Sequence, residues 1–174
     1  MKFQTEKGEP LPNDDLDLQL VWLTAVENEC ASNVDASVLC QYWLSFITPF
    51  WNEYGIAKTL MNRGISPSVA GDCETNEWKH SNGAWIRTEI WACLNPGSVE
   101  TAVKYAIEDA VVDHGVGEGT SAAAFVAALE SAEFFIDDTP MQKVTDMLAK
   151  CRKLQNEHGL SIVFIDYIQL MKGP

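Results

Sequence analysis

The sequence lacks any apolar stretch long enough to cross a membrane, and it opens with no secretory signal. A spanning helix needs roughly 20 predominantly apolar residues, and no run in this chain approaches that length. A signal peptide would need a basic start followed by an apolar core, and the first residues have neither. We therefore expect a cytoplasmic protein without a membrane partner.

The sequence also lacks paired cysteine motifs. Its cysteines are odd in number, widely separated and never arranged as CxxC. This pattern argues against a disulfide framework and against a zinc site, and it is typical of a reducing compartment. The five positions are Cys30, Cys40, Cys73, Cys93 and Cys151.

Basic residues are scarce, and the imbalance is confined to one part of the chain. The sequence has 12 Lys and Arg against 25 Asp and Glu. Residues 1–134 hold 7 basic and 20 acidic side chains, whereas residues 135–174 hold 5 of each. An acidic first part repels phosphate backbones, so we do not expect it to bind nucleic acid. The change near residue 134 predicts that two unlike pieces are joined there.

Apolar residues recur at helical spacing through the first part of the chain. The pattern predicts a mainly α fold in which residues 1–133 form a helical bundle. Residues 64–81 contain Pro67 and Gly71 and are predicted to form a loop. Helices are expected at residues 16–29, after Asp35, after Asn52, and at residues 81–94, 98–111 and 120–133.

Residues 134–174 follow a different pattern. A helix is predicted from about Gln142 to Glu157, with Val144 and Leu148 on its inward face. Residues 161–168 are apolar on both faces, which is typical of a central strand in a parallel sheet. We therefore expect a helix–strand unit from an α/β domain. Since the chain offers this strand no convincing partner, self-association through it is possible.

Three carboxylates lie within four positions at the start of the first predicted helix. Asp14, Asp15 and Asp17 immediately precede or begin its apolar stripe. One interpretation is that they cap the helix and stabilise the positive end of its dipole. The other is that adjacent carboxylates form half of a Mg²⁺ site, because Mg²⁺ prefers a few carboxylate oxygens together with water. Spacing alone favours the first interpretation.

The glycines around residue 117 do not form a dinucleotide-binding motif. Gly115, Gly117 and Gly119 alternate, but a helix precedes them where that motif requires a strand. His114 stands just before them. By residue type alone, such a histidine is more often a surface or capping residue than a catalytic one.

Residues 13–133 contain four ordered motifs: Asn13-Asp14-Asp15-Leu16-Asp17, Trp51-Asn52-Glu53-Tyr54-Gly55-Ile56-Ala57, Ser81-Asn82-Gly83-Ala84 leading to Arg87, and Glu108-Asp109 through His114. Together they resemble the ADP-ribosylglycohydrolase family, all-helical enzymes that remove ADP-ribose from modified side chains or small molecules. The sequence has Asn13 where that family usually has Thr.

This resemblance implies a binuclear magnesium site that binds ADP-ribose and activates water at the anomeric carbon. Asp14 and Asp15 match the first pair of metal-binding acids. The expected partner is ADP-ribose or an ADP-ribosylated substrate, and no catalytic residue is assigned. The positions that match ADP-ribose contacts are Ser81, Asn82, Gly83 and His114.

Three further stretches run from Phe135 to Pro140, from Lys150 to Leu160 and from Ile165 to Met171. They make residues from about 134 to 172 resemble a different family, the bacterial replicative helicases of the DnaB type. The resemblance implies that Asp166 is the Walker B acid, which positions the Mg²⁺ of bound ATP. The chain contains no G-x-x-x-x-G-K-[ST] phosphate loop, so we do not expect helicase activity from it alone.

The main prediction is a partial ADP-ribosylglycohydrolase-like hydrolase. The alternatives are a fragment of a replicative DNA helicase and an inactive fusion of two gene fragments. Residues 1–133 are predicted to form the partial ADP-ribosylglycohydrolase-like helical domain, and residues 134–174 a fragment of a replicative-helicase ATPase domain.

Overall fold

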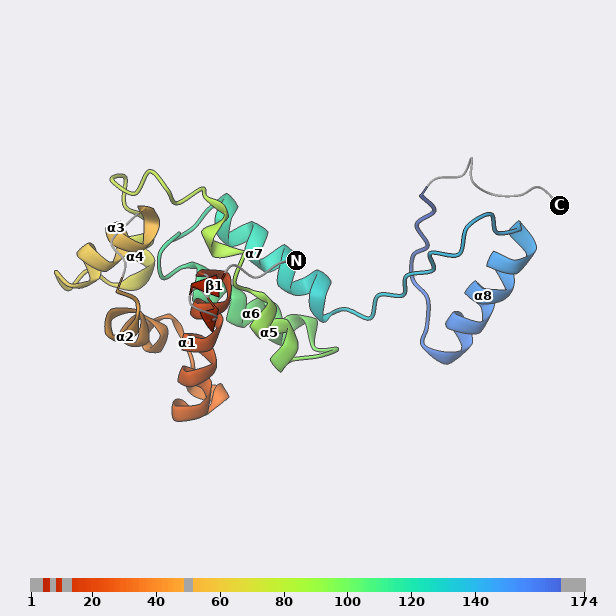
Figure 1. Ribbon diagram of the computed structural model, residues 1–174, viewed down its shortest axis with the longest axis horizontal. Coiled ribbons are helices and arrows are strands. Elements are labelled where there is room, and N and C mark those ends of the chain that lie inside the picture. Colours follow the sequence, from red (N-terminus) through yellow and green to blue (C-terminus); the bar gives the residue numbers. More distant parts are fainter. Residues whose placement is uncertain (1–4, 7–8, 11–13, 49–51, 167–174) are drawn as a thin grey trace. The chain divides into compact units, whose positions relative to one another are not determined.

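The computed structural model describes residues 5–6, 9–10, 14–48 and 52–166. It divides into two compact units, Met1–Phe134 and Phe135–Pro174 (Figure 1). The described part is mainly α-helical, which confirms the predicted fold class. None of the described helices has both the length and the apolar character needed to cross a bilayer.

The first unit opens with a short hairpin and two helices. The strands β1 (Thr5–Glu6) and β2 (Glu9–Pro10) pair antiparallel. Helix α1 spans Asp14–Glu29, the 3₁₀ turn η1 spans Ala31–Asn33, and α2 spans Ala36–Phe46. The Asp35 carboxylate accepts the Val38 backbone N–H at 2.9 Å, so it caps α2, the helix expected after Asp35.

The middle of the first unit differs from the sequence prediction in two places. Helix α3 (Asn52–Met61) is followed by α4 (Pro67–Asp72) inside the segment predicted to be a loop. Proline has a φ suited to the first helical turn, which explains a helix that begins at Pro67. The single helix predicted at residues 81–94 is instead a 3₁₀ turn, η2 (Asn82–Ala84), followed by α5 (Glu89–Leu94).

The last two helices of this unit pack closely on each other. Helices α6 (Val99–Ala110) and α7 (Glu118–Ser131) form the most extensive helix pair of the unit. Their contact is lined by small side chains, which let two helix backbones approach each other. The fully buried alanines are Ala102, Ala106, Ala110, Ala123 and Ala127.

Aromatic side chains fill the core of the first unit. The buried rings of Trp22 and Trp43 are stacked with centroids 5.7 Å apart, and Tyr54 lies 5.6 Å from Trp43 in a tilted arrangement. On the α5–α6 side, Trp91 stacks on Tyr105 at 5.5 Å. Two aromatic side chains near the end of α2 differ in burial: Trp43 is buried, whereas Phe46 is exposed.

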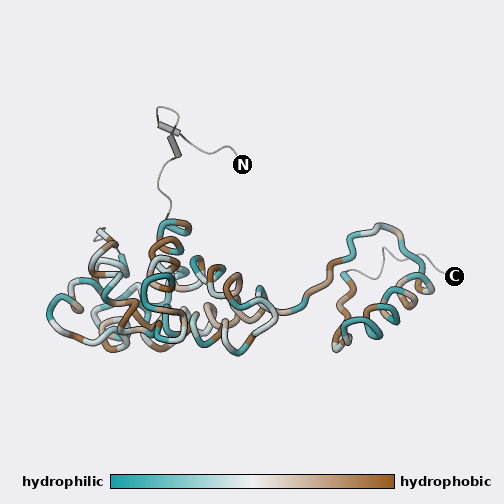
Figure 2. The backbone as a smooth tube through the Cα atoms, turned by 90° about the horizontal axis from the view of Figure 1, so that it is seen from below, coloured by the Kyte–Doolittle hydropathy of each residue, from teal (hydrophilic) through white to brown (hydrophobic). Residues whose placement is uncertain are grey.

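The second unit has one helix and no buried side chain among its described residues. Helix α8 spans Val144–Glu157, and hydrophobic and hydrophilic residues alternate along it (Figure 2). The predicted inward residues Val144 and Leu148 are about half exposed, at 51% and 49%. The expectation that they face a core is therefore wrong for this unit by itself.

The predicted strand at residues 161–168 does not form in the described part. Residues 161–165 have no regular structure, Asp166 lies in a turn, and residues 167–168 lie outside the described ranges. A strand needs a neighbour for its backbone N–H and C=O groups, and no other strand is described in this unit. Its apolar residues are consequently exposed, Phe164 by 80%.

We expect Trp43→Ala to lower the free energy of unfolding by about 3–5 kcal/mol, because it removes a large ring from the packed core. Leu20→Ala on the neighbouring α1 is the control, since Leu20 is 61% exposed. Its effect should stay within about 0.5 kcal/mol. Urea unfolding followed by circular dichroism measures both, and equal effects would contradict this description of the core.

Candidate functional site

A fully buried arginine joins three segments of the first unit. Arg87 lies between η2 and α5, and its Nε donates to Asp109 Oδ1 at 2.9 Å. Its Nη2 donates to Asp113 Oδ1 at 2.7 Å, and its Nη1 donates to Asp113 Oδ2 at 3.2 Å and to the Gly83 carbonyl at 2.8 Å. Arg87, Asp109 and Asp113 have no exposed surface. Such a group is stable in the interior only when its hydrogen bonds are satisfied, as they are here.

Two indole rings complete the surroundings of this ion cluster. Trp91 Nε1 donates to Asp109 Oδ2 at 2.9 Å. The Arg87 guanidinium lies 5.1 Å from the Trp43 ring centroid, a cation–π contact. The charged cluster is therefore continuous with the aromatic core and does not stand apart from it.

Burial and charge act in opposite directions on these groups. Burial by itself raises the pKa of Asp113, but the charge of Arg87 and the hydrogen bond from His114 lower it to about 2. Burial would lower the pKa of Arg87, yet Asp109 and Asp113 raise it overall. For Asp109, burial dominates and its pKa is raised. Asp113 is therefore a carboxylate at neutral pH.

A chain of hydrogen bonds leads from Asp113 toward the surface. His114 is buried; its Nδ1 lies 2.8 Å from Asp113 Oδ1 and its Nε2 lies 3.0 Å from Ser81 Oγ. Ser81 Oγ also lies 2.8 Å from Glu53 Oε1 and accepts the Gly83 backbone N–H at 3.2 Å. Ser81 is half-buried whereas Glu53 is buried, with 5% exposure, so this chain reaches the surface at Ser81.

Two glycines make room for this arrangement. A Cβ atom on Gly83 would lie 2.1 Å from Glu53 Oε1, and one on Gly119 would lie 2.9 Å from His114 Cδ2. Both distances are far below van der Waals contact. The positions therefore suit glycine because the site's side chains approach their backbones closely.

The structure brings together three of the four predicted ADP-ribose contacts. Ser81, Gly83 and His114 are neighbours, although more than 30 positions separate Ser81 from His114 in the sequence. Asn82 follows Ser81 in η2 and is exposed. Their role in binding a substrate stays a prediction.

The predicted metal ligands Asp14 and Asp15 are the first two residues of α1. Burial, and secondarily the charge of Asp14, raises the pKa of Asp15. The charge of Asp14 also acts on the pKa of the buried Tyr54 hydroxyl, as do the charges of Arg87 and Glu53. Two adjacent carboxylates fit a Mg²⁺ ion whose remaining ligands are water or substrate oxygens.

A larger metal-binding group is not found among the described residues. In that part of the chain, no three His, Cys, Asp or Glu side chains are arranged to hold an ion. The binuclear site that the resemblance implies is therefore not assembled from these residues alone. Asp166, the predicted Walker B acid, is exposed and lies in a turn of the second unit.

No role was predicted from sequence for Glu53, Arg87, Asp109 or Asp113, although all four lie within the motifs quoted above. One signal could have found the aspartates. Positions 102, 106, 109 and 113 share one helical face, and the first two are alanines that pack in the core. Two acids on such a face indicate a buried, paired charge.

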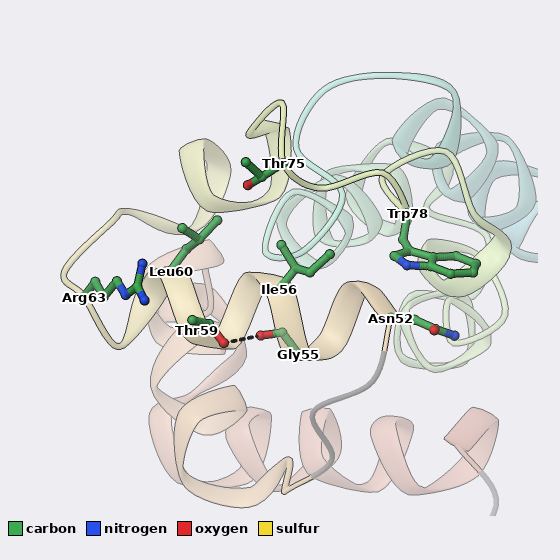
Figure 3. Close-up of a pocket in the computed structure, with 8 residues that line it drawn as sticks. All are labelled: Asn52, Gly55, Ile56, Thr59, Leu60, Arg63, Thr75 and Trp78. Atoms are coloured by element: carbon green, nitrogen blue, oxygen red, sulfur yellow. Dashed lines mark hydrogen bonds between the residues drawn. The ribbon is translucent and has the colours of Figure 1, made fainter.

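An open pocket of about 400 Å³ lies along α3 (Figure 3). Asn52 and Trp78 lie at one end of it and Arg63 at the other. None of the predicted site residues lines it. The pocket is thus separate from the Ser81–His114 chain, although Asn52 precedes Glu53 in sequence.

The C-terminal part of the chain is similar to known helicases. Residues 106–174 match the family described as the DnaB-like helicase C terminal domain. The chain is 48% identical over 48 residues to the replicative DNA helicase DnaB of Geobacillus stearothermophilus, covering 28% of this chain and 11% of that protein. It is 44% identical over 48 residues to DnaC of Bacillus subtilis, with the same coverage.

A further relative is the replicative DNA helicase DnaB of Rhodothermus marinus, 50% identical over 45 residues, which are 26% of this chain and 5% of that protein. The chain thus spans about a tenth or less of the length of these relatives. No solved structure matches it. These comparisons give no support to the ADP-ribosylglycohydrolase resemblance of residues 13–133, which stays a prediction.

The family match begins earlier than the predicted helicase segment. It starts at Ala106, inside α6, whereas the sequence analysis placed the start near residue 134. Residues 106–134 belong to the first unit by their contacts. The similarity to DnaB-like helicases therefore covers α7 and the end of α6 as well as the second unit.

We expect Asp113 to contribute to stability in a pH-dependent way. Its pKa in the folded chain, about 2, lies below the ordinary value of 3.8. Its contribution is therefore complete above about pH 4 and is lost as the pH falls toward 2. That difference corresponds to about 2 kcal/mol.

Urea unfolding at pH 5, 4 and 3 measures this contribution. Asp113→Asn should be less stable at pH 5 by about 3–5 kcal/mol, because it unbalances a buried ion pair, and its stability should fall less steeply with acid. The control Asp72→Asn removes an exposed partner of Lys79 and should keep the wild-type slope. A wild-type slope in Asp113→Asn would contradict the ion cluster.

Proposed function

We propose that the C-terminal unit is a fragment of a DnaB-like helicase ATPase core that works only within a complete core. The observation that carries this is the 48% identity over 48 residues to a replicative helicase. The packing supports it: the described part of this unit buries no side chain, and its apolar run is exposed. Such a run needs neighbouring strands, which the remainder of an α/β core would supply.

In this proposal, Asp166 supplies the acidic group of a Mg²⁺–ATP site, and the apolar residues before it pair with the sheet of the core. Walker B acids hold the metal ion that bridges the phosphates of bound nucleotide. The phosphate-binding loop, which this chain lacks, comes from the rest of the core. Helicase and ATPase activity therefore belong to the assembled core.

Fragment complementation tests the proposal. The full chain is mixed with the Geobacillus stearothermophilus helicase from which the matching 48 residues have been deleted. We expect the two to co-elute in size-exclusion chromatography and to recover ATP hydrolysis. Asp166→Asn should co-elute without restoring hydrolysis.

The matched pair of variants for association is Phe164→Asp and Phe125→Asp. Phe164 lies in the apolar run, whereas Phe125 is a comparably exposed residue of α7. Phe164→Asp should abolish co-elution and Phe125→Asp should preserve it. Failure of the wild-type chain to co-elute would overturn the proposal.

For the first unit we propose an ADP-ribosylglycohydrolase-like function, the Mg²⁺-dependent hydrolysis of a glycosidic bond of ADP-ribose. The observation that favours it is the contact between Ser81 and His114 beside Gly83, three positions that the family motifs indicate. Asp14 and Asp15 would hold Mg²⁺, which, when bound, polarises water and ligand oxygens. Ser81 and Asn82 form the accessible edge at which the ligand would be oriented.

Thermal unfolding with and without ADP-ribose and Mg²⁺ tests this second proposal. A ligand at 100 times its Kd adds about 2.7 kcal/mol, which we expect to raise the Tm by several degrees. The Asp14→Asn, Asp15→Asn double variant should lose the shift. Asp17→Asn, an exposed acid in the same first turn, should keep it. No shift in the wild-type protein would overturn the proposal.

A further inference from the structure

The Ser81 hydroxyl has one hydrogen but two neighbouring groups that could accept it. Ser81 Oγ lies within hydrogen-bond distance of two acceptor-type groups, Glu53 Oε1 at 2.8 Å and His114 Nε2 at 3.0 Å. One hydroxyl hydrogen can serve only one of them. The other contact therefore needs a hydrogen from Glu53 or from His114.

The hydrogen bond at His114 Nδ1 limits where this additional hydrogen can lie. Asp113 accepts hydrogen bonds from Arg87 on both of its oxygens, so it is a carboxylate and cannot donate. His114 Nδ1, at 2.8 Å from Asp113 Oδ1, must therefore carry a hydrogen and donate it. The remaining hydrogen resides either on His114 Nε2 or on Glu53.

We propose that Glu53 and His114 share one proton through the Ser81 hydroxyl, forming a proton relay that acts on a hydroxyl or water oxygen of a ligand bound beside Ser81. In one state His114 is doubly protonated and Glu53 is a carboxylate. Its Nε2–H donates to Ser81, and Ser81 donates to Glu53. In the other state Glu53 is protonated and donates to Ser81, and Ser81 donates to a neutral His114.

The two states are related by the shift of two hydrogens. His114 Nε2–H breaks as a new O–H bond forms on Ser81, and the original Ser81 O–H breaks as one forms on Glu53. The total number of protons and the total charge do not change. Ser81 Oγ also keeps the Gly83 N–H donor in both states, so each state satisfies all four groups.

The surroundings suit a relay with its outlet at Glu53. His114 has no exposed surface, whereas Glu53 retains 5% and Ser81 is half-buried. His114 therefore stores the proton, and Glu53 exchanges it with a ligand oxygen. When Glu53 donates, its O–H bond breaks and an O–H bond forms on the ligand, leaving Glu53 ionised and His114 neutral.

The charges around the pair come from several elements. Asp113 faces His114 directly, Arg87 neutralises Asp113 from the η2–α5 segment, and Asp109 of α6 lies beyond Arg87. Tyr54, next to Glu53 on α3, is buried near the same charges. The use of the relay on a ligand rests on the function proposed for the first unit, but the proton count does not.

Nuclear magnetic resonance of the ligand-free full chain at pH 7.5 tests the proton count. Nitrogen shifts of the His114 ring and the carboxyl carbon shift of Glu53 report the state of each group. We expect one proton beyond a neutral imidazole and an ionised carboxylate, seen as a doubly protonated ring or as a protonated Glu53. A neutral ring protonated on Nδ1 together with an ionised Glu53 would overturn the proposal.

Two variants of equal size separate a relay from simple packing. In Glu53→Gln, the amide N–H can donate to Ser81, so His114 should become neutral with an unprotonated Nε2. Glu118→Gln changes an exposed carboxylate paired with His80 and should leave the His114 ring signals unchanged. If His114 stays doubly protonated in Glu53→Gln, the relay is wrong.

The outcome is distinct from that of the ADP-ribose experiment. The proton count is measured without ligand, whereas the Tm shift requires ADP-ribose and Mg²⁺. One additional proton without a Tm shift would support the relay and contradict ADP-ribose as the ligand. A Tm shift without the additional proton would support ADP-ribose binding and contradict the relay.

Discussion

The first unit depends on the burial of Arg87. A guanidinium without exposed surface must have its donors satisfied and its charge balanced, because an unpaired charge in the interior costs several kcal/mol. Asp109 and Asp113 meet this requirement from the end of α6, and the Gly83 carbonyl meets it from η2. Since Asp113 also accepts from His114, the interaction that stabilises the core also orients the candidate site.

This coupling gives the site a rigid inner end and a more open outer end. His114 is held between Asp113 and Ser81, and Gly83 and Gly119 allow its ring to lie close to their backbones. Ser81 is half-buried and Glu53 beside it retains 5% exposure, so a ligand would meet the site at this end. A proton stored on a fixed, buried ring and exchanged at a carboxylate beside Ser81 is an arrangement suited to acid–base chemistry.

The second unit, unlike the first, has no buried core in its described part. Its sequence is similar to the DnaB-like helicase C terminal domain, but its described residues bury none of their side chains. A strand apolar on both faces is stable only between other strands, because its backbone groups need partners as much as its side chains need burial. Residues 161–165 therefore stay irregular, and their apolar surface is the reason to expect a complementary core.

The sequence by itself determined most helices of both units, because apolar residues at 3.6-residue spacing and caps such as Asp35 are local signals. It also indicated Ser81, Gly83 and His114 through motifs. Tertiary packing determined three features that local signals do not specify. These are the interruption between η2 and α5 at Arg87, the pairing of that arginine with Asp109 and Asp113, and the contact of Glu53 with Ser81. These features join residues 22 to 28 positions apart, so only packing brings them together. The missing strand has the same cause, since its pattern is local but its stability depends on neighbours.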